Sequence, residues 1–401
     1  MGEREIQRTY RGKATREEDH EHDGPERAVV VAVYGQKDDE EARLAELAAL
    51  LDTAGAEVEE VVVQHRDRPE PRTYLGKGRL EDLQLLVKDL KPDLVVVDAE
   101  LSAGQQRQLE DRLKKRVVDR TGLILDIFAL HATTAEGKLQ VELAQLEYSY
   151  SRQEGLWQHL ERLGGGVGTR GPGETQLESD RRLLRNRMGA LRRRLADVAR
   201  SRDVMRSRRL ASDAPRVALA GYTNAGKSSL MNALTGADVS TADALFETLD
   251  STTRALELGS HKVLLSDTVG FVRDLPHELV EAFASTLDEV RDADLILHVA
   301  DATEHRRTRD DQAAAVERTL EEIGAGEVPR LRVLNKIDGC APEERGDLSR
   351  ERSDAVLVSA RTGEGLDDLR DRLLDVARAR LTPVDVLIPY SRGELVSSVY
   401  A

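Results

Sequence analysis

A glycine-bounded loop in the middle of the chain has the composition of a phosphate-binding site. Residues 221–228 read Gly-Tyr-Thr-Asn-Ala-Gly-Lys-Ser, after an apolar run and before a stretch with helical spacing. A strand, a glycine loop and a helix N-terminus in that order direct backbone N–H groups and the helix dipole at a phosphate. Lys227 can then reach the β- and γ-phosphates of a nucleotide, and the Ser228 hydroxyl can bind Mg²⁺. The residues predicted to bind the phosphates are Gly221, Tyr222, Thr223, Asn224, Ala225, Gly226, Lys227, Ser228 and Ser229.

A second motif, Asp-x-x-Gly at 267–270, follows another apolar run. Asp267 at a strand end can hold Mg²⁺ through water, and the Gly270 N–H can meet the γ-phosphate, so this loop would sense that phosphate. The segment 249–254 lies between the two motifs and is expected to supply a threonine ligand for Mg²⁺. Thr252 is favoured, and Thr253 is the alternative. The predicted catalytic residues are Lys227, Thr252 and Gly270.

The tetrapeptide Asn-Lys-Ile-Asp at 335–338 predicts which base is bound. The Asp338 carboxylate can accept hydrogen bonds from guanine N1–H and the N2 amine, a pair of donors that adenine lacks. A buried carboxylate left unpaired is costly, so guanine is preferred and the substrate is GTP. Lys336 can lie along the base, Asn335 can tie this loop to the phosphate loop, and the Ala360 N–H is free for guanine O6. The residues predicted to surround the base are Asn335, Lys336, Asp338, Ser359 and Ala360.

The elements that position these motifs alternate between buried strands and helices. Continuous apolar strands separated by helices predict a parallel sheet that is covered on both faces. Leucines on three- and four-residue steps then predict two antiparallel helices joined by a glycine-rich loop. The expected strands are 28–34, 58–63, 94–98 and 116–119, the helices between them are 41–54, 80–90 and 105–115, and the loop of the hairpin is 164–173.

The charge of the chain is unevenly distributed. The net charge is −15, and there are 48 arginines against 11 lysines. Such an acidic, lysine-poor surface stays hydrated in concentrated salt, which predicts a halophilic source; arginine-biased codons are the alternative. Residues 180–209 are the exception, with 12 arginines and three aspartates, a net charge of +9. This favours a surface that faces RNA over an ordinary solvated helix. The predicted RNA contacts are Gly164, Gly165, Gly166 and Arg170 in the loop, and Arg192, Arg193 and Arg194 on the helix.

The composition also limits where the protein works. No apolar run approaches the ~20 residues of a membrane span, and the polar N-terminus lacks the core of a signal peptide. A single cysteine, Cys340, cannot form an internal disulfide. The chain is therefore expected in the cytoplasm, and we expect a monomer.

The motifs and several further stretches together resemble the HflX family of GTPases. The stretches that carry the resemblance are 74–78, 119–128, 136–146, 164–176 and 270–276. The resemblance implies binding to the large ribosomal subunit and ribosomal RNA, splitting or rescue of stalled ribosomes, and GTP hydrolysis that the subunit stimulates. A GTP-gated RNA-binding protein of ribosome assembly or RNA modification, without splitting activity, is the alternative. An archaeal, halophilic member of the family is expected.

The expected fold class is α/β, with five divisions. The predicted divisions are a disordered tail at 1–24, an N-terminal parallel α/β domain at 25–135, an antiparallel helical hairpin at 136–212, a Ras-like P-loop GTPase domain with a mixed sheet at 213–382, and a short C-terminal segment at 383–401, expected to be incomplete.

Hydrolysis is expected to need outside help. Phe271 follows Gly270, where Ras-like proteins carry a glutamine that orients water, and a phenyl ring cannot do this. GTPases that resemble this one, with an asparagine at the position of Asn224, hold a potassium ion there. Such an ion would neutralise charge on the bridging oxygen. The alternative is that Asn224 is only a residue that favours turns.

Overall fold

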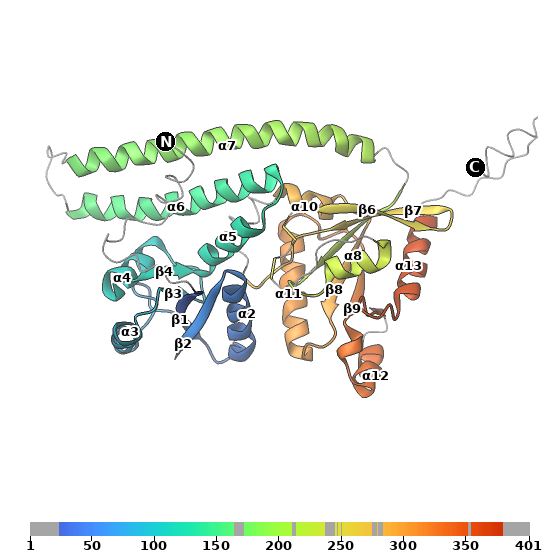
Figure 1. Cartoon of the computed structure of the whole chain (residues 1–401), viewed down its shortest axis with the longest axis horizontal. Helices are drawn as coiled ribbons and strands as arrows, with labels where there is room; N and C mark the ends of the chain where they lie inside the picture. Colours follow the sequence, from blue (N-terminus) through green and yellow to red (C-terminus); the bar gives the residue numbers. More distant parts are fainter. Residues whose placement is uncertain are drawn as a thin grey trace, which may run out of the picture.

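The computed structural model describes residues 24–163, 172–210, 214–236, 245–246, 248–249, 251–274, 279, 284–351 and 354–379. Two sheets lie side by side. A long pair of helices runs along one side of the first sheet, and the longer helix, residues 172–210, continues over the second (Figure 1). We call residues 24–131 the N-terminal unit, the helix pair the hairpin, and residues 214–379 the C-terminal unit. The expected tail except Gly24, most of the glycine-rich loop, and the segment 383–401 lie outside the described residues.

The N-terminal unit is built on a parallel sheet, as the sequence predicts. Its four strands lie in the order β2-β1-β3-β4 and pair in parallel throughout. Apolar side chains of α2 and α5 pack on one face of the sheet, and those of α3 and α4 pack on the other. The elements are β1 Glu26–Tyr34, α2 Glu40–Thr53, β2 Ala56–His65, α3 Lys77–Leu90, β3 Leu94–Val97, α4 Ala103–Leu113, β4 Arg116–Asp119 and α5 Arg120–His131.

Helix α5 was not anticipated from the sequence. Its N-cap is Asp119, whose side chain accepts a hydrogen bond from the Gly122 N–H at 2.9 Å. The same carboxylate accepts one from the Tyr148 hydroxyl at 2.6 Å and pairs with Arg152, both on the hairpin. One buried aspartate therefore caps a helix and anchors the hairpin to the N-terminal unit.

The hairpin consists of α6 (Ala135–Leu163) and α7 (Pro172–Leu210). The leucine steps predicted this pairing, and its buried seam includes Leu139, Leu146 and Leu191. Pro172 and Gly173, expected in the loop, begin α7 instead. Proline suits a helix start because its missing N–H would have no partner in the first turn.

The C-terminal unit holds a mixed sheet, which confirms the expected fold class. Within the described residues, its six strands lie in the order β10-β9-β8-β5-β7-β6, and only β6 runs antiparallel to its neighbour. The carboxyl ends of β5, β7 and β9 therefore meet at one edge, and each carries one of the predicted motifs. The elements are β5 Arg216–Gly221, α8 Lys227–Thr235, β6 Thr252–Leu258, β7 His261–Asp267, α10 Ala284–Arg291, β8 Leu295–Asp301, α11 Arg306–Glu322, β9 Arg330–Asn335, the 3-10 helix η1 Ile337–Gly339, α12 Pro342–Glu351, β10 Val356–Leu357 and α13 Leu366–Ala379.

The two units share one apolar cluster. Leu47 and Phe128 of the N-terminal unit belong to it, together with Phe246, Leu249 and Phe271 of the C-terminal unit. The face formed by α2 and α5 thus packs against the sheet edge that carries the motifs (Figure 1). Among the described residues, no helix is long and apolar enough to cross a membrane.

Candidate functional site

The phosphate-binding loop turns sharply between β5 and α8. Gly226 has φ +82°, and a Cβ there would lie 2.4 Å from Asn335 Nδ2, so both backbone and space require glycine. Lys227 begins α8 and is buried, and its Nζ donates to the carbonyl oxygens of Gly221 at 3.2 Å and Tyr222 at 2.9 Å. Burial lowers the pKa of Lys227 to about 8, although the charge of Asp267 opposes this.

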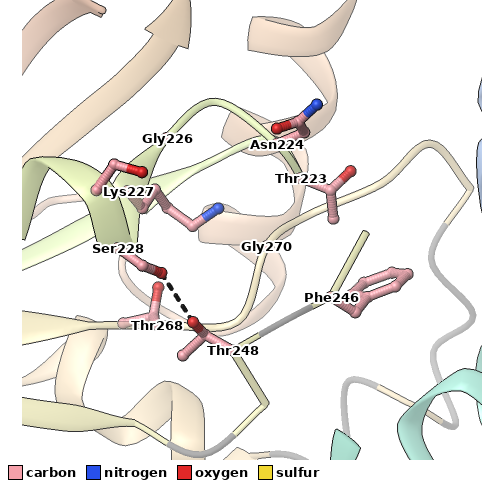
Figure 2. A pocket seen from close by; sticks show the side chains of 10 residues that line it. Thr223, Asn224, Gly226, Lys227, Ser228, Phe246, Thr248, Thr268 and Gly270 are labelled. Atoms are coloured by element: carbon pink, nitrogen blue, oxygen red, sulfur yellow. Dashed lines mark hydrogen bonds between the residues drawn. The ribbon is translucent and has the colours of Figure 1, made fainter. Parts of the chain in front are cut away.

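An open cavity lies over this loop, and Figure 2 shows the Lys227 side chain extending across it. The predicted residues that line it are Thr223, Asn224, Gly226, Lys227, Ser228, Ser229 and Gly270. The lining residues that sequence reasoning missed are Phe246, Thr248 and Thr268.

Three oxygen-bearing side chains meet at the edge of the cavity. Ser228 Oγ donates to Asp267 Oδ2 at 2.5 Å and lies 2.8 Å from Thr248 Oγ1, which itself donates to Asp267 Oδ2 at 3.3 Å. Burial raises the pKa of the Asp267 carboxyl, and the charge of Lys227 opposes this rise. Two hydroxyls and one carboxylate are ligands that Mg²⁺ prefers, and so the group fits this ion. Elsewhere in the described chain, no cluster of three or more His, Cys, Asp or Glu side chains could hold a metal.

The threonine in this group differs from the predicted one. Thr252 lies on β6, paired with Asp267 of β7 in the antiparallel register. Thr253 Oγ1 lies 2.9 Å from both Ser266 Oγ and Glu289 Oε2. Thr248, four residues before Thr252, is the threonine that contacts Ser228. The segment 249–254, which was expected to supply the threonine, already belongs to strand β6 from residue 252 onwards. Exposed and buried side chains alternate towards the end of this strand.

The predicted base-binding residues also come together. Asn335 Nδ2 donates to the Ala225 carbonyl at 3.0 Å, which ties this loop to the phosphate loop as expected. Asp338 Oδ1 accepts from Ser359 Oγ at 2.7 Å, and Arg361 pairs with the other carboxylate oxygen. The Ser359 hydrogen bond, and then Arg361, lower the pKa of Asp338, so it is ionised at neutral pH.

Two details of the base site differ from expectation. The Ala360 N–H is not free for guanine O6, because it donates to Asn335 Oδ1 at 3.0 Å. The amide of Asn335 thus bridges both loops of the base site, and guanine O6 must share or displace this bond. Lys336 has φ +65°, and its Nζ forms an ion pair with Asp301 Oδ2 at 2.8 Å, at the end of β8.

The Tyr222 side chain of the phosphate loop contacts the N-terminal unit. Its hydroxyl donates to Glu46 Oε2 at 2.5 Å and accepts from the Arg273 N–H at 2.7 Å. Glu46 also pairs with Arg120, which is buried and donates to Asp98 Oδ1 at 2.7 Å. The spacing of residues gave no signal for this contact, since Tyr222 and Glu46 are 176 positions apart.

The predicted RNA contacts are only partly described. Arg192, Arg193 and Arg194 are exposed on α7, and Arg192 Nη2 donates to Glu147 Oε1 of α6 at 2.7 Å. The acidic residues of α6 therefore offset part of the arginine charge. Gly164, Gly165, Gly166 and Arg170 lie outside the described residues.

Comparison with known families divides the chain into three matched regions. Residues 41–129 match a model described as GTP-binding GTPase N-terminal, and residues 131–209 match GTP-binding GTPase Middle Region. Residues 216–336 match a model described as 50S ribosome-binding GTPase. The third region includes both phosphate motifs and ends at Lys336 of the base motif.

Individual relatives match almost the whole chain. The GTPase HflX of Caldanaerobacter subterraneus is 48% identical over 368 residues, which are 92% of this chain and 84% of that protein. The GTPase HflX of Escherichia coli is 45% identical over 382 residues, 94% of this chain and 89% of that protein. A GTP-binding protein from the archaeon Sulfolobus solfataricus, solved with GDP, is 26% identical with a TM-score of 0.42, over 88% of this chain and 99% of that one. The two HflX relatives are bacterial, and nothing in the comparison supports the expected archaeal or halophilic source. From the identity and coverage of these two HflX proteins, the chain belongs to the HflX family of GTPases.

Proposed function

We propose that this GTPase binds GTP with Mg²⁺ in the cavity over the phosphate loop and hydrolyses it on the large ribosomal subunit, where it splits or rescues stalled ribosomes. One observation carries the nucleotide part: Asn335 joins the base loop, with Asp338, to the phosphate loop. A single site thus offers contacts to both ends of a guanine nucleotide. The description of the matched family model, 50S ribosome-binding GTPase, supports the ribosomal part. We expect the protein to act as a cytoplasmic monomer.

The residues of the chain suggest how the site works. Lys227 must exchange its bonds to the carbonyls of Gly221 and Tyr222 for phosphate oxygens, which stabilise its charged form. Ser228 and Thr248 would hold Mg²⁺ directly and Asp267 through water, and the ion would neutralise charge on the β- and γ-phosphates. A Cβ at Gly270 would lie 2.7 Å from Thr223 Cγ2 and 3.1 Å from Lys227 Nζ. A side chain here would crowd Thr223 and Lys227, so glycine leaves this N–H accessible to a γ-phosphate.

The hairpin offers the surface for ribosomal RNA. Arg193 and Arg194 are exposed on α7, a strongly basic helix in an acidic chain. Arginine side chains that bind RNA phosphates release condensed cations, and this release gains less free energy as the salt concentration rises, so the affinity falls with salt. We include the loop residues Gly164, Gly165, Gly166 and Arg170 in this surface on the basis of the family resemblance.

Sedimentation of intact ribosomes with the protein and GTP tests the proposal. We expect free subunits to increase at the expense of intact ribosomes, and the protein to travel with the large subunit. Changing Arg193 and Arg194 to Glu should weaken this association and leave GTP binding intact. The matched control changes Arg372 and Arg378 to Glu, which are exposed arginines on α13. Association without splitting would favour the RNA-binding alternative, and the absence of association at every salt concentration would contradict the ribosomal role.

A further inference from the structure

The segment that carries Thr248 is held by the N-terminal unit. The Phe246 ring meets the Phe128 ring of α5 edge to face, with centroids 4.7 Å apart and planes at 88°. Both rings are buried, Phe128 to 1% exposure and Phe246 to 2%. One residue earlier, the Leu245 N–H donates to Thr53 Oγ1 at the end of α2, at 3.2 Å. The contact therefore combines an aromatic pair with a backbone hydrogen bond.

The backbone at Phe246 shows that this contact constrains the segment. Phe246 has φ +58°, in the left-handed region that an aromatic residue rarely adopts. Such a conformation persists only where surrounding contacts determine it, and here those contacts come from α5 and α2. Figure 2 shows the Phe246 ring on the opposite side of the cavity from Lys227.

Thr248 lies two residues beyond this anchor. Its hydroxyl meets Ser228 at 2.8 Å and Asp267 at 3.3 Å, and the next residue, Leu249, is again buried at 2% exposure. Thr248 thus stands between two buried apolar side chains of one short segment. A shift of the Phe246 anchor would move the Thr248 hydroxyl with it.

We propose that Phe246 and Phe128, with the Leu245–Thr53 hydrogen bond, position the Thr248 hydroxyl for Mg²⁺ in the GTP-bound state. Phe246 is a positioning residue, because it acts through Thr248. The inference rests on the proposed nucleotide site. The N-terminal unit would then help the protein to distinguish GTP from GDP, because a threonine in such a loop binds Mg²⁺ only when the γ-phosphate is present.

Equilibrium binding of a fluorescent, non-hydrolysable GTP analogue and of fluorescent GDP, titrated with Mg²⁺, tests the inference. In Phe246→Ala, the Mg²⁺ concentration for half-maximal binding of the GTP analogue should rise about two- to tenfold, the range expected for losing an aromatic pair. The Mg²⁺ dependence of GDP binding should not change. Adding Phe128→Leu to Phe246→Ala should cause no further rise, because the pair is already broken.

A gentler pair of variants does not risk the fold. Thr53 lies at the end of α2, and its hydroxyl accepts from the Leu245 N–H and donates to the Ala49 carbonyl at 2.8 Å. Thr53→Val removes both bonds, but only the first reaches the segment with Thr248, so the Mg²⁺ requirement should rise in the same direction. Thr53→Ser keeps the hydroxyl and should therefore bind the GTP analogue with the parent's Mg²⁺ dependence. Leu109→Ala opens a cavity on the far face of the N-terminal sheet and controls for lost stability; its Mg²⁺ dependence should match that of the parent.

Two results would overturn the inference. One is a Phe246→Ala or Thr53→Val protein that binds the GTP analogue with the parent's Mg²⁺ dependence. The other is an equal loss of affinity for both nucleotides, as a purely structural contact would give. If the proposed nucleotide site itself is wrong, the result differs from both of these, because the parent protein would then bind the GTP analogue without any Mg²⁺ dependence.

Discussion

The Tyr222 hydroxyl, in the phosphate-binding loop, donates a 2.5 Å hydrogen bond to the Glu46 carboxylate on α2 of the N-terminal unit. Burial, and then the charge of Glu46, raises the pKa of Tyr222, so the hydroxyl keeps its proton at neutral pH. Glu46 also pairs with Arg273, in the segment that follows the Asp-x-x-Gly motif. One half-buried carboxylate thus connects the phosphate loop and the segment after Gly270 to the N-terminal unit. A movement of either loop must change these contacts.

Replacing Tyr222 by Phe should weaken the link between the units. The variant loses the bonds to Glu46 and Arg273, but Glu46 keeps Arg120, so we expect a loss of about 1–2 kcal/mol in unfolding free energy. Tyr34→Phe is the matched control, because the Tyr34 hydroxyl donates to Asp98 Oδ2 at 2.8 Å within the N-terminal unit. Chemical denaturation and GDP dissociation would be measured for both. Tyr222→Phe alone should change GDP dissociation, and equal effects on dissociation would contradict the coupling.

Thr248, and not Thr252, should be the threonine that matters for the GTP-bound state. Thr248→Val removes a hydroxyl from the group around Asp267, so the GTP analogue should need at least about tenfold more Mg²⁺, as expected for losing one ligand in this group. Thr252→Val keeps a β-branched residue on β6, where it suits a strand, and should bind like the parent. Mg²⁺ titrations of nucleotide binding compare the two. A larger effect at Thr252 would restore the prediction made from the sequence.

Guanine specificity should depend on the Asp338 carboxylate. Asp338→Asn replaces one acceptor by a donor that faces the donors of guanine, so GDP affinity should fall about tenfold to a hundredfold. Xanthosine diphosphate, which offers an acceptor there, should bind more tightly to the variant than to the parent. Competition binding with both nucleotides measures this. Asp347→Asn, at an exposed aspartate of α12, is the control, and unchanged GDP affinity in Asp338→Asn would place the base elsewhere.

The sequence predicted those parts of the site that depend on one strand and the loop after it. The phosphate loop and the base motif each follow a buried strand, so residue order alone placed Lys227 and Asp338 correctly at one sheet edge. The contact of Thr248 with Ser228 and Asp267 was not anticipated, because it depends on where β6 begins, and the polar residues at the start of β6 could equally have belonged to a loop. The contact between Tyr222 and Glu46 could not be predicted, since no local pattern relates residues on different sheets. The family resemblance covered both regions but did not reveal the contact.

Nucleotide affinity should fall as the pH rises above about 8. The pKa of Lys227 is lowered to about 8 by burial, and phosphate oxygens raise it again on binding. Below about pH 7, Lys227 is fully protonated in the free protein as well as in the complex, so nucleotide affinity is at its maximum. As the pH rises through 8, the free protein loses this proton, and affinity falls by at most about tenfold per pH unit. Lys227→Met should bind weakly and without this dependence, while it keeps the titration of the nucleotide itself. GDP affinity measured across this range in both proteins gives the difference, and parallel curves would exclude Lys227 as the cause.

Potassium should accelerate hydrolysis if Asn224 holds the ion, because Phe271 offers no polar group that could assist the reaction. Asn224 lines the cavity, is exposed, and has φ +59°, a conformation that asparagine tolerates better than most residues. Its backbone thus suits the turn-forming alternative, and its place in the cavity suits the ion. A cation beside the bridging oxygen stabilises developing charge as an arginine finger does, an effect worth up to about 10³ to 10⁵ in rate. GTP turnover in KCl should therefore exceed turnover in NaCl at equal ionic strength, and Asn224→Ala, which keeps the loop but loses the amide oxygen, should turn over equally slowly in both. Equal rates for the parent in the two salts would leave Asn224 as a turn residue and the ribosome as the source of the missing catalytic group.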